Sequence, residues 1–129
     1  MIEHRQTIFG EDGNCFATCV ACLLDLPVED VPNFCAKENW WENVQKWLSE
    51  RNLFAIEIDC EVQRMRNLPL GQLAILTGEE NGGLLHCVIA SYDGIDENGY
   101  MQWRFKHDPH PDDTYIKKIE YMCFIVRKL

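Results

Sequence analysis

The chain has 129 residues, of which 47% are hydrophobic and 26% charged, enough for one domain with its own hydrophobic core. Its net charge of −9, from 21 acidic and 12 basic residues, disfavours binding to nucleic acid phosphates. No apolar run is long enough to span a membrane, the N-terminus lacks a secretory signal pattern, and the seven cysteines form no framework of spaced pairs. We therefore expect one cytoplasmic domain over residues 1–129, with reduced thiols and no membrane partner. Its oligomeric state is not indicated by the sequence.

The first strong structural signal is a helix that follows a glycine turn. The segment Ile2–Phe9 is predicted to be extended and to lead into the turn at residues 10–13. Asn14 is positioned to cap the helix through its side chain. Every residue from Phe16 to Leu24 except Thr18 is apolar or small, which predicts a helix buried on all sides. This helix is expected to end before the proline at position 27.

The remaining elements are a second helix and a series of strands. Apolar residues recur at helical spacing from Trp40 to Glu50, with Asn39 as a candidate cap. Strands are predicted at residues 53–58, 72–77, 84–92, 100–106 and 121–126. Because helices come first and strands follow, we expect an α+β fold with an antiparallel sheet.

Cys15 stands at the N-terminus of the first helix, where two interpretations of it are open. The partial positive charge of a helix N-terminus lowers a thiol pKa and favours the reactive thiolate. Alternatively, Cys15 is a small core residue, since Cys15, Cys19 and Cys22 share one helical stripe.

A histidine and an aspartate complete a candidate catalytic set with this cysteine. A thiol nucleophile needs a base, and the base needs a group that orients it. His86 lies near the start of an apolar strand, and Asp108 follows the strand paired with it through the turn-rich segment 93–99. The hairpin therefore predicts that His86 and Asp108 lie side by side. Gln6, upstream, could donate to an oxyanion.

Two metal-based interpretations are also open but less favoured. Cys15, Cys19 and Cys22 have the spacing of iron–sulfur ligands in radical S-adenosylmethionine enzymes, although they lie on a continuous apolar helix rather than a loop. His86, His107 and His110 could contribute to a zinc site, but no tight ligand pair supports it. We expect no metal and no cofactor, and we expect His107 to lie in a polar loop.

Three separated blocks resemble papain-like cysteine peptidases. The helix block runs from Gly13 to Pro27, the histidine block is Leu85–Ile89, and the aspartate block is Lys106–Pro109. These blocks are most similar to the bacteriocin-processing peptidases that cleave after a double glycine, and to small bacterial and phage proteins of that group. The turn before Cys15 also resembles that of ovarian-tumour deubiquitinases, another papain-like group.

The resemblance implies a papain-like fold, with a buried N-terminal nucleophile helix packed on an antiparallel sheet. It implies Cys15 as nucleophile, His86 as general base and acid, and Asp108 as the orienting carboxylate. Gln6 would complete the oxyanion hole with the backbone N–H of Cys15. The family's glutamine lies closer to its cysteine than Gln6 lies to Cys15, so Asn14 is the alternative donor.

The expected function is therefore a cysteine-dependent hydrolase or acyltransferase that acts on a peptide, isopeptide or amide bond of a peptide or protein substrate. The alternative is a catalytically inactive papain-like binding or adaptor protein of a bacterium or phage.

Overall fold

The computed structural model describes residues 1–11, 13–59, 67–80, 84–113 and 115–129. Within these ranges it contains two α-helices, two short 3-10 helices and five strands. The helices are α1 (Cys15–Leu24), η1 (Val28–Asp30), η2 (Phe34–Ala36) and α2 (Trp40–Ser49). The strands are β1 (Leu53–Asp59), β2 (Leu73–Glu79), β3 (Leu85–Ile95), β4 (Met101–His107) and β5 (Lys118–Arg127).

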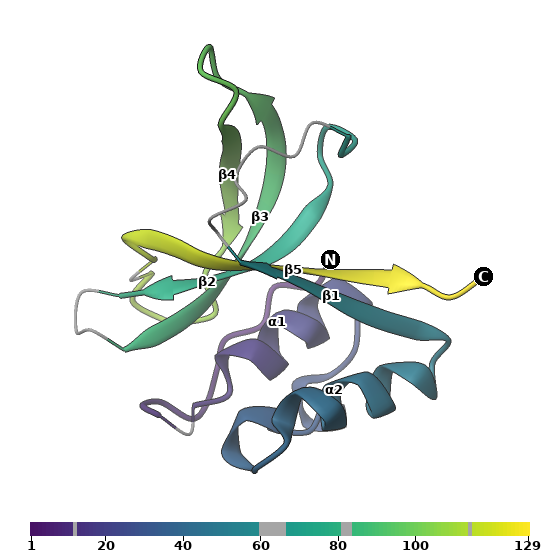
Figure 1. Ribbon diagram of the computed structural model, residues 1–129. Helices are drawn as coiled ribbons and strands as arrows, with labels where there is room; N and C mark the ends of the chain where they lie inside the picture. The colour runs from purple at the N-terminus through teal and green to yellow at the C-terminus, as the bar shows by residue number, and fades with distance from the viewer. Residues whose placement is uncertain (12, 60–66, 81–83, 114) are drawn as a thin grey trace.

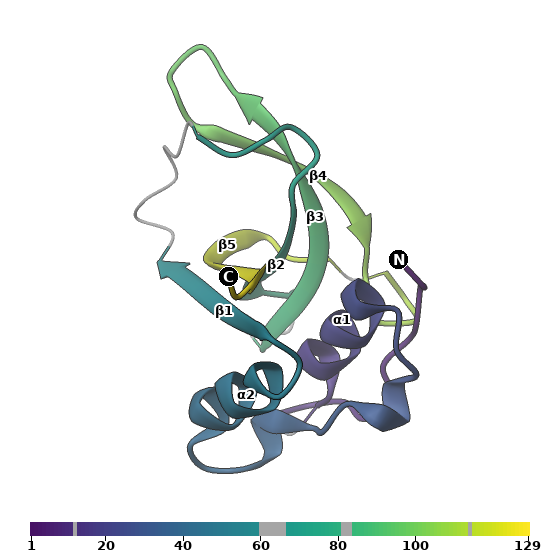
Figure 2. The same cartoon turned by 90° about the vertical axis from the view of Figure 1, so that its right-hand side faces the viewer.

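The strands form one antiparallel sheet in the order β1-β5-β2-β3-β4. Both α-helices lie on one side of it, with α1 against β3 and α2 against β1 (Figure 1). The tip of the β3–β4 hairpin extends away from the helices, whereas the N-terminal segment runs beside α1 and the end of β4 (Figure 2). The predicted α+β class and antiparallel sheet are confirmed. No helix in the described ranges is long and apolar enough to cross a membrane.

Alternation along the strands produces a core on each face of the sheet. On the helix-facing side, Ile75 of β2, Cys87 of β3 and Cys123 of β5 pack against the buried residues of α1. On the other side, residues at the intervening positions, such as Leu76 and Met122, form a second buried cluster. This period-two division is the property that allows both faces of a central strand to be buried.

The second core is closed by curvature of the sheet. The rings of Trp103 on β4 and Phe124 on β5 have centroids 6.4 Å apart, although β2 and β3 lie between these strands in the sheet. Twist between neighbouring strands accumulates across the sheet and brings its concave face together. The β3–β4 pairing also brings the chain back toward the start of β3, which is where His86 lies.

The prediction that the side chains of Asn14 and Asn39 cap the two helices is wrong. Each residue occupies the position before its helix, but neither side chain bonds to the helix backbone. The Asn14 carbonyl oxygen instead accepts the backbone N–H and the hydroxyl of Thr18. Its side chain turns outward, accepts the N–H groups of Thr7 and Ile8 at 3.0 Å each, and donates to the Thr7 hydroxyl. Asn14 thus connects the N-terminal segment to α1 through side-chain hydrogen bonds.

Replacement of Asn14 should therefore destabilise the protein. Asn14→Ala leaves two backbone N–H groups of the N-terminal segment without their acceptor, so we expect a loss of about 1–3 kcal/mol in the free energy of unfolding. Asn14→Asp keeps the acceptor oxygen and should lose less. Urea denaturation measures both, with Asn43→Ala on the exposed side of α2 as the control. Equal stability of Asn14→Ala and the wild type would contradict this role.

Candidate active site

Cys15 is the first residue of α1 and lies between the helix and the sheet. A tight turn precedes it, in which the N–H of Gly13 bonds to the carbonyl of Gly10 at 3.0 Å. A Cβ atom at position 13 would lie 2.9 Å from that carbonyl oxygen, so the turn requires glycine there. The side chain of Cys15 is half-buried, whereas Cys19 and Cys22 further along α1 are buried.

Two cavities meet at Cys15 and share Gly10 and Leu85 in their walls. We call the one of about 500 Å³, between the sheet and the N-termini of both α-helices, the large cavity. The one of about 170 Å³, which also contacts His86, we call the small cavity. Cys15 therefore lines both cavities and is accessible from each of them.

His86 and Asp108 form a buried pair, as the hairpin predicted. The Nε2 atom of His86 lies 2.5 Å from Oδ1 of Asp108. His86 is 3% exposed and Asp108 is 1% exposed, so solvent does not compete for this contact. Because Nε2 is engaged with the carboxylate, Nδ1 is the ring nitrogen that remains for the Cys15 thiol.

Both oxygens of the Asp108 carboxylate are held in place. Oδ1 accepts the backbone N–H of His110 at 2.8 Å, and Oδ2 accepts that of Tyr115. Burial of the carboxyl alone would raise its pKa, but these donors together with His86 outweigh it and lower the pKa of Asp108. The aspartate is thus held as the anion that a catalytic histidine needs beside it.

The Cys15 thiol has a strongly lowered pKa, of about 5. The largest cause is a hydrogen bond from the side chain of Cys87, and a hydrogen bond from His86 and its positive charge add to it. Burial opposes these effects. Cys87 itself keeps its proton, since the bond to Cys15 and burial raise its pKa well above the ordinary range. Cys87 therefore acts as a neutral donor to a Cys15 thiolate.

His86 shows the complementary shift. Burial would lower its pKa, but the contacts with Asp108 and with Cys15 prevail and raise the pKa to about 9. A cysteine with a pKa of about 5 beside a histidine with a pKa of about 9 is a thiolate–imidazolium pair across the neutral pH range. This is the charge state of an activated thiol nucleophile.

The two candidate oxyanion donors occupy different places. Gln6 is buried in the wall of the small cavity, together with Cys15 and His86. Its Nε2 donates one hydrogen to the Ile8 carbonyl at 3.1 Å, which leaves the second N–H of the amide. Asn14 lines neither cavity at Cys15, and its side chain is occupied with the N-terminal segment.

The cysteines and histidines considered as metal ligands form no metal site among the described residues. The described residues contain no group of three or more His, Cys, Asp or Glu side chains that could hold a metal ion. The prediction that His107 lies in a polar loop is wrong. His107 is buried at the end of β4, and its Nε2 bonds to the His4 carbonyl oxygen at 2.5 Å. Burial raises the pKa of Cys19 well above the ordinary range, as expected for an inert core thiol.

Two residues at the site, Cys87 and Arg5, were not singled out from the sequence, and a third, His110, was considered only as a zinc ligand. Cys87 lies two residues before Ile89 on β3, so strand alternation places both side chains on the helix-facing side, and this signal could have identified it. His110 lines the small cavity, with its ring centroid 6.0 Å from that of His86. Arg5 donates from Nη1 to the carbonyl oxygens of Asp108 and His110, a contact between residues more than 100 positions apart that no local pattern encodes.

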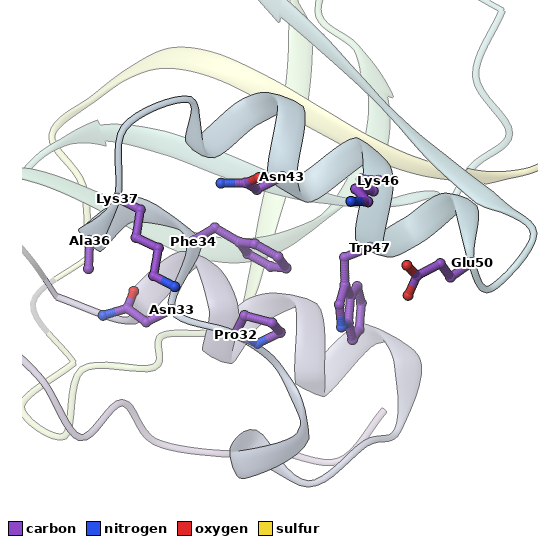
Figure 3. A pocket seen from close by; sticks show the side chains of 9 residues that line it. All are labelled: Pro32, Asn33, Phe34, Ala36, Lys37, Asn43, Lys46, Trp47 and Glu50. Carbon is purple, nitrogen blue, oxygen red and sulfur yellow. The ribbon is translucent and has the colours of Figure 1, made fainter.

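A further cavity lies apart from this site. It has a volume of about 540 Å³ and is formed by η2, the preceding loop and α2, with Trp47, Lys37 and Glu50 in its wall (Figure 3). Among the described residues that line it, none is shared with either cavity at Cys15 and none is a cysteine or a histidine.

Comparison with known proteins yields no relative: the chain matches no protein-family model, no curated protein and no solved structure.

The charge state of Cys15 makes its alkylation selective at acidic pH. The rate of modification by iodoacetamide should be half-maximal near pH 5, because only the thiolate reacts. Cys35 is the internal control, since it lines the same large cavity and burial raises its pKa to about 11. Peptide mapping after brief treatment at pH 6 should find the adduct on Cys15 and not on Cys35.

Two variants separate the causes of the shift. Cys87→Ala removes the largest contribution and His86→Ala the next, so each should move the alkylation profile of Cys15 to higher pH. Uniform slow labelling of all cysteines at pH 6 would contradict the activated thiolate.

Proposed function

We propose that the protein is a cysteine-dependent hydrolase or acyltransferase with a papain-like fold, acting on amide or peptide bonds in the cytoplasm. One observation carries the proposal: the buried His86–Asp108 pair lies beside a thiol at a helix N-terminus, where two cavities meet. The packing of that helix on the antiparallel sheet supports the papain-like fold. The free thiols of the described cysteines agree with a reducing compartment.

The reaction follows from the charge state of the pair. The Cys15 thiolate attacks the substrate carbonyl carbon, and the electron pair of the carbonyl moves to its oxygen. As the carbon–nitrogen bond breaks, Nδ1 of the imidazolium delivers its proton to the departing amine. This leaves an acyl group on the Cys15 sulfur and a neutral His86, and no redox partner is required.

The second half-reaction reverses these roles. Neutral His86 takes a proton from water, or from an acceptor amine, which then attacks the thioester carbonyl. The carbon–sulfur bond breaks and the thiolate is restored beside a protonated His86. Asp108 holds the ring in one tautomer and stabilises its charge in both halves of the cycle.

The oxyanion would lie in the small cavity. The first N–H groups of a helix have no intrahelical acceptor, so the backbone N–H of Cys15 is available there. The second donor in this proposal is the amide of Gln6, which is fixed by its bond to Ile8 and by burial. Pre-oriented donors of this kind stabilise the tetrahedral intermediate without reorganisation.

An activated ester tests the covalent step without knowledge of the natural substrate. Treatment with p-nitrophenyl acetate should release a burst of p-nitrophenol and leave one acetyl group on Cys15, detectable by mass spectrometry. His86→Ala should slow turnover by about 10²–10⁴-fold, since it removes the general acid and base. Cys15→Ala should abolish the burst, whereas Cys22→Ala on the same helix should retain it.

If the protein is instead an inactive binding or adaptor protein, Cys15 should not be acetylated selectively. In that case acetylation would be slow, spread over several cysteines and insensitive to His86→Ala. Such a result would overturn the proposed hydrolase.

A further inference from the structure

We infer that the substrate carries a positively charged side chain on the acyl side of the scissile bond, and that Glu57 binds it in the large cavity. This inference rests on the proposed function and specifies its substrate class.

The position of His86 orients the substrate. The general acid has to reach the departing nitrogen, so the leaving group lies on the side of Cys15 that contacts His86. His86 lines the small cavity and not the large one. The acyl part of the substrate therefore occupies the large cavity, which has about 500 Å³ against about 170 Å³ for the small one.

Four strands contribute a row of side chains to the sheet side of the large cavity. Thr77 of β2 pairs with Cys87 of β3 on one side and Tyr121 of β5 on the other, and Glu57 of β1 pairs with Cys123 of β5. Thr77, Cys87, Tyr121 and Glu57 all line the cavity. Glu57 thus lies on the far strand of this row from the β3 residue that contacts Cys15.

The helix side of the cavity is aromatic. Phe16 of α1 and Trp40 at the start of α2 line it, with ring centroids 5.6 Å apart. A channel with aromatic walls that leads to a carboxylate suits a side chain with an apolar stem and a cationic end, because the stem packs on the rings and the cation faces the carboxylate.

The charge in the cavity is of one sign. Among the described residues that line it, the charged side chains besides the Cys15 thiolate are Glu57 and Glu11, and none is Lys, Arg or His. No hydrogen bond or ion pair to another described residue engages the Glu57 carboxylate. Glu57 is exposed on β1, and the desolvation that its carboxyl does undergo raises its pKa. An arginine or lysine side chain of a substrate would supply a cationic partner.

Three matched esters test the inference: the methyl esters of Nα-acetyl-arginine, Nα-acetyl-citrulline and Nα-acetyl-norleucine. Citrulline has nearly the shape of arginine without its charge, and methanol is a small leaving group. We expect kcat/KM for the arginine ester to exceed that of the other two by about tenfold or more. Glu57→Gln should lower the arginine value by a similar factor and leave the citrulline value unchanged.

Glu50→Gln is the control for overall charge. It removes the same charge from the wall of the cavity near Trp47, so all three esters should keep their wild-type rates. Faster or equal hydrolysis of the norleucine ester by the wild type would overturn the inference while retaining the hydrolase. An equal fall for all three esters in Glu57→Gln would also overturn it. Absence of hydrolysis of every ester, together with no acetylation of Cys15 by p-nitrophenyl acetate, would overturn the proposed function itself.

Discussion

The buried carboxylate of Asp108 is the constraint on which the site depends. An ionised carboxylate removed from water is unfavourable unless donors surround it, and here His86 and two backbone N–H groups do so. Those donors come from the start of β3 and from the segment after β4. Solvation of one charge therefore fixes the relative position of two chain segments that the hairpin alone would leave adjustable.

The N-terminal segment completes this arrangement from the other direction. The backbone N–H of Gln6 bonds to the Pro109 carbonyl at 2.8 Å, and Arg5 bonds to the carbonyl of Asp108. Asn14 fastens the same segment to α1. A strand-like segment without a sheet partner thus links the helix that carries Cys15 to the loop that carries Asp108. These contacts connect Cys15 with the Asp108 loop, although the two lie far apart in the sequence.

Local signals predicted much of this molecule. The apolar run of α1 and the paired strands 84–92 and 100–106 were sufficient to place His86 beside Asp108, because hairpin pairing is a short-range property. The extent of α2 followed from its helical periodicity, and that of α1 from its apolar run and the proline after it. The side chain of Asn14 was misassigned because an asparagine before a helix can bond outward as well as inward, and the choice depends on a segment packed there by tertiary contacts. The row that includes Glu57 depends on strand order, which periodicity does not specify. The contacts of Arg5 depend on how the N-terminal segment packs against the segment after β4.

The charge of the whole chain explains why Cys15 needs more than one donor. A net charge of −9 disfavours another anion, so a thiolate has to be stabilised locally. The Cys87 thiol contributes most, as a neutral hydrogen bond that brings no competing charge, and His86 adds a hydrogen bond and a positive charge. A helix N-terminus also favours an anion. A lower pKa also lowers the intrinsic nucleophilicity of a thiolate, so further stabilisation would cost reactivity. A net negative charge also favours the approach of a cation, so the field that disfavours the Cys15 thiolate would favour the side chain proposed to reach Glu57.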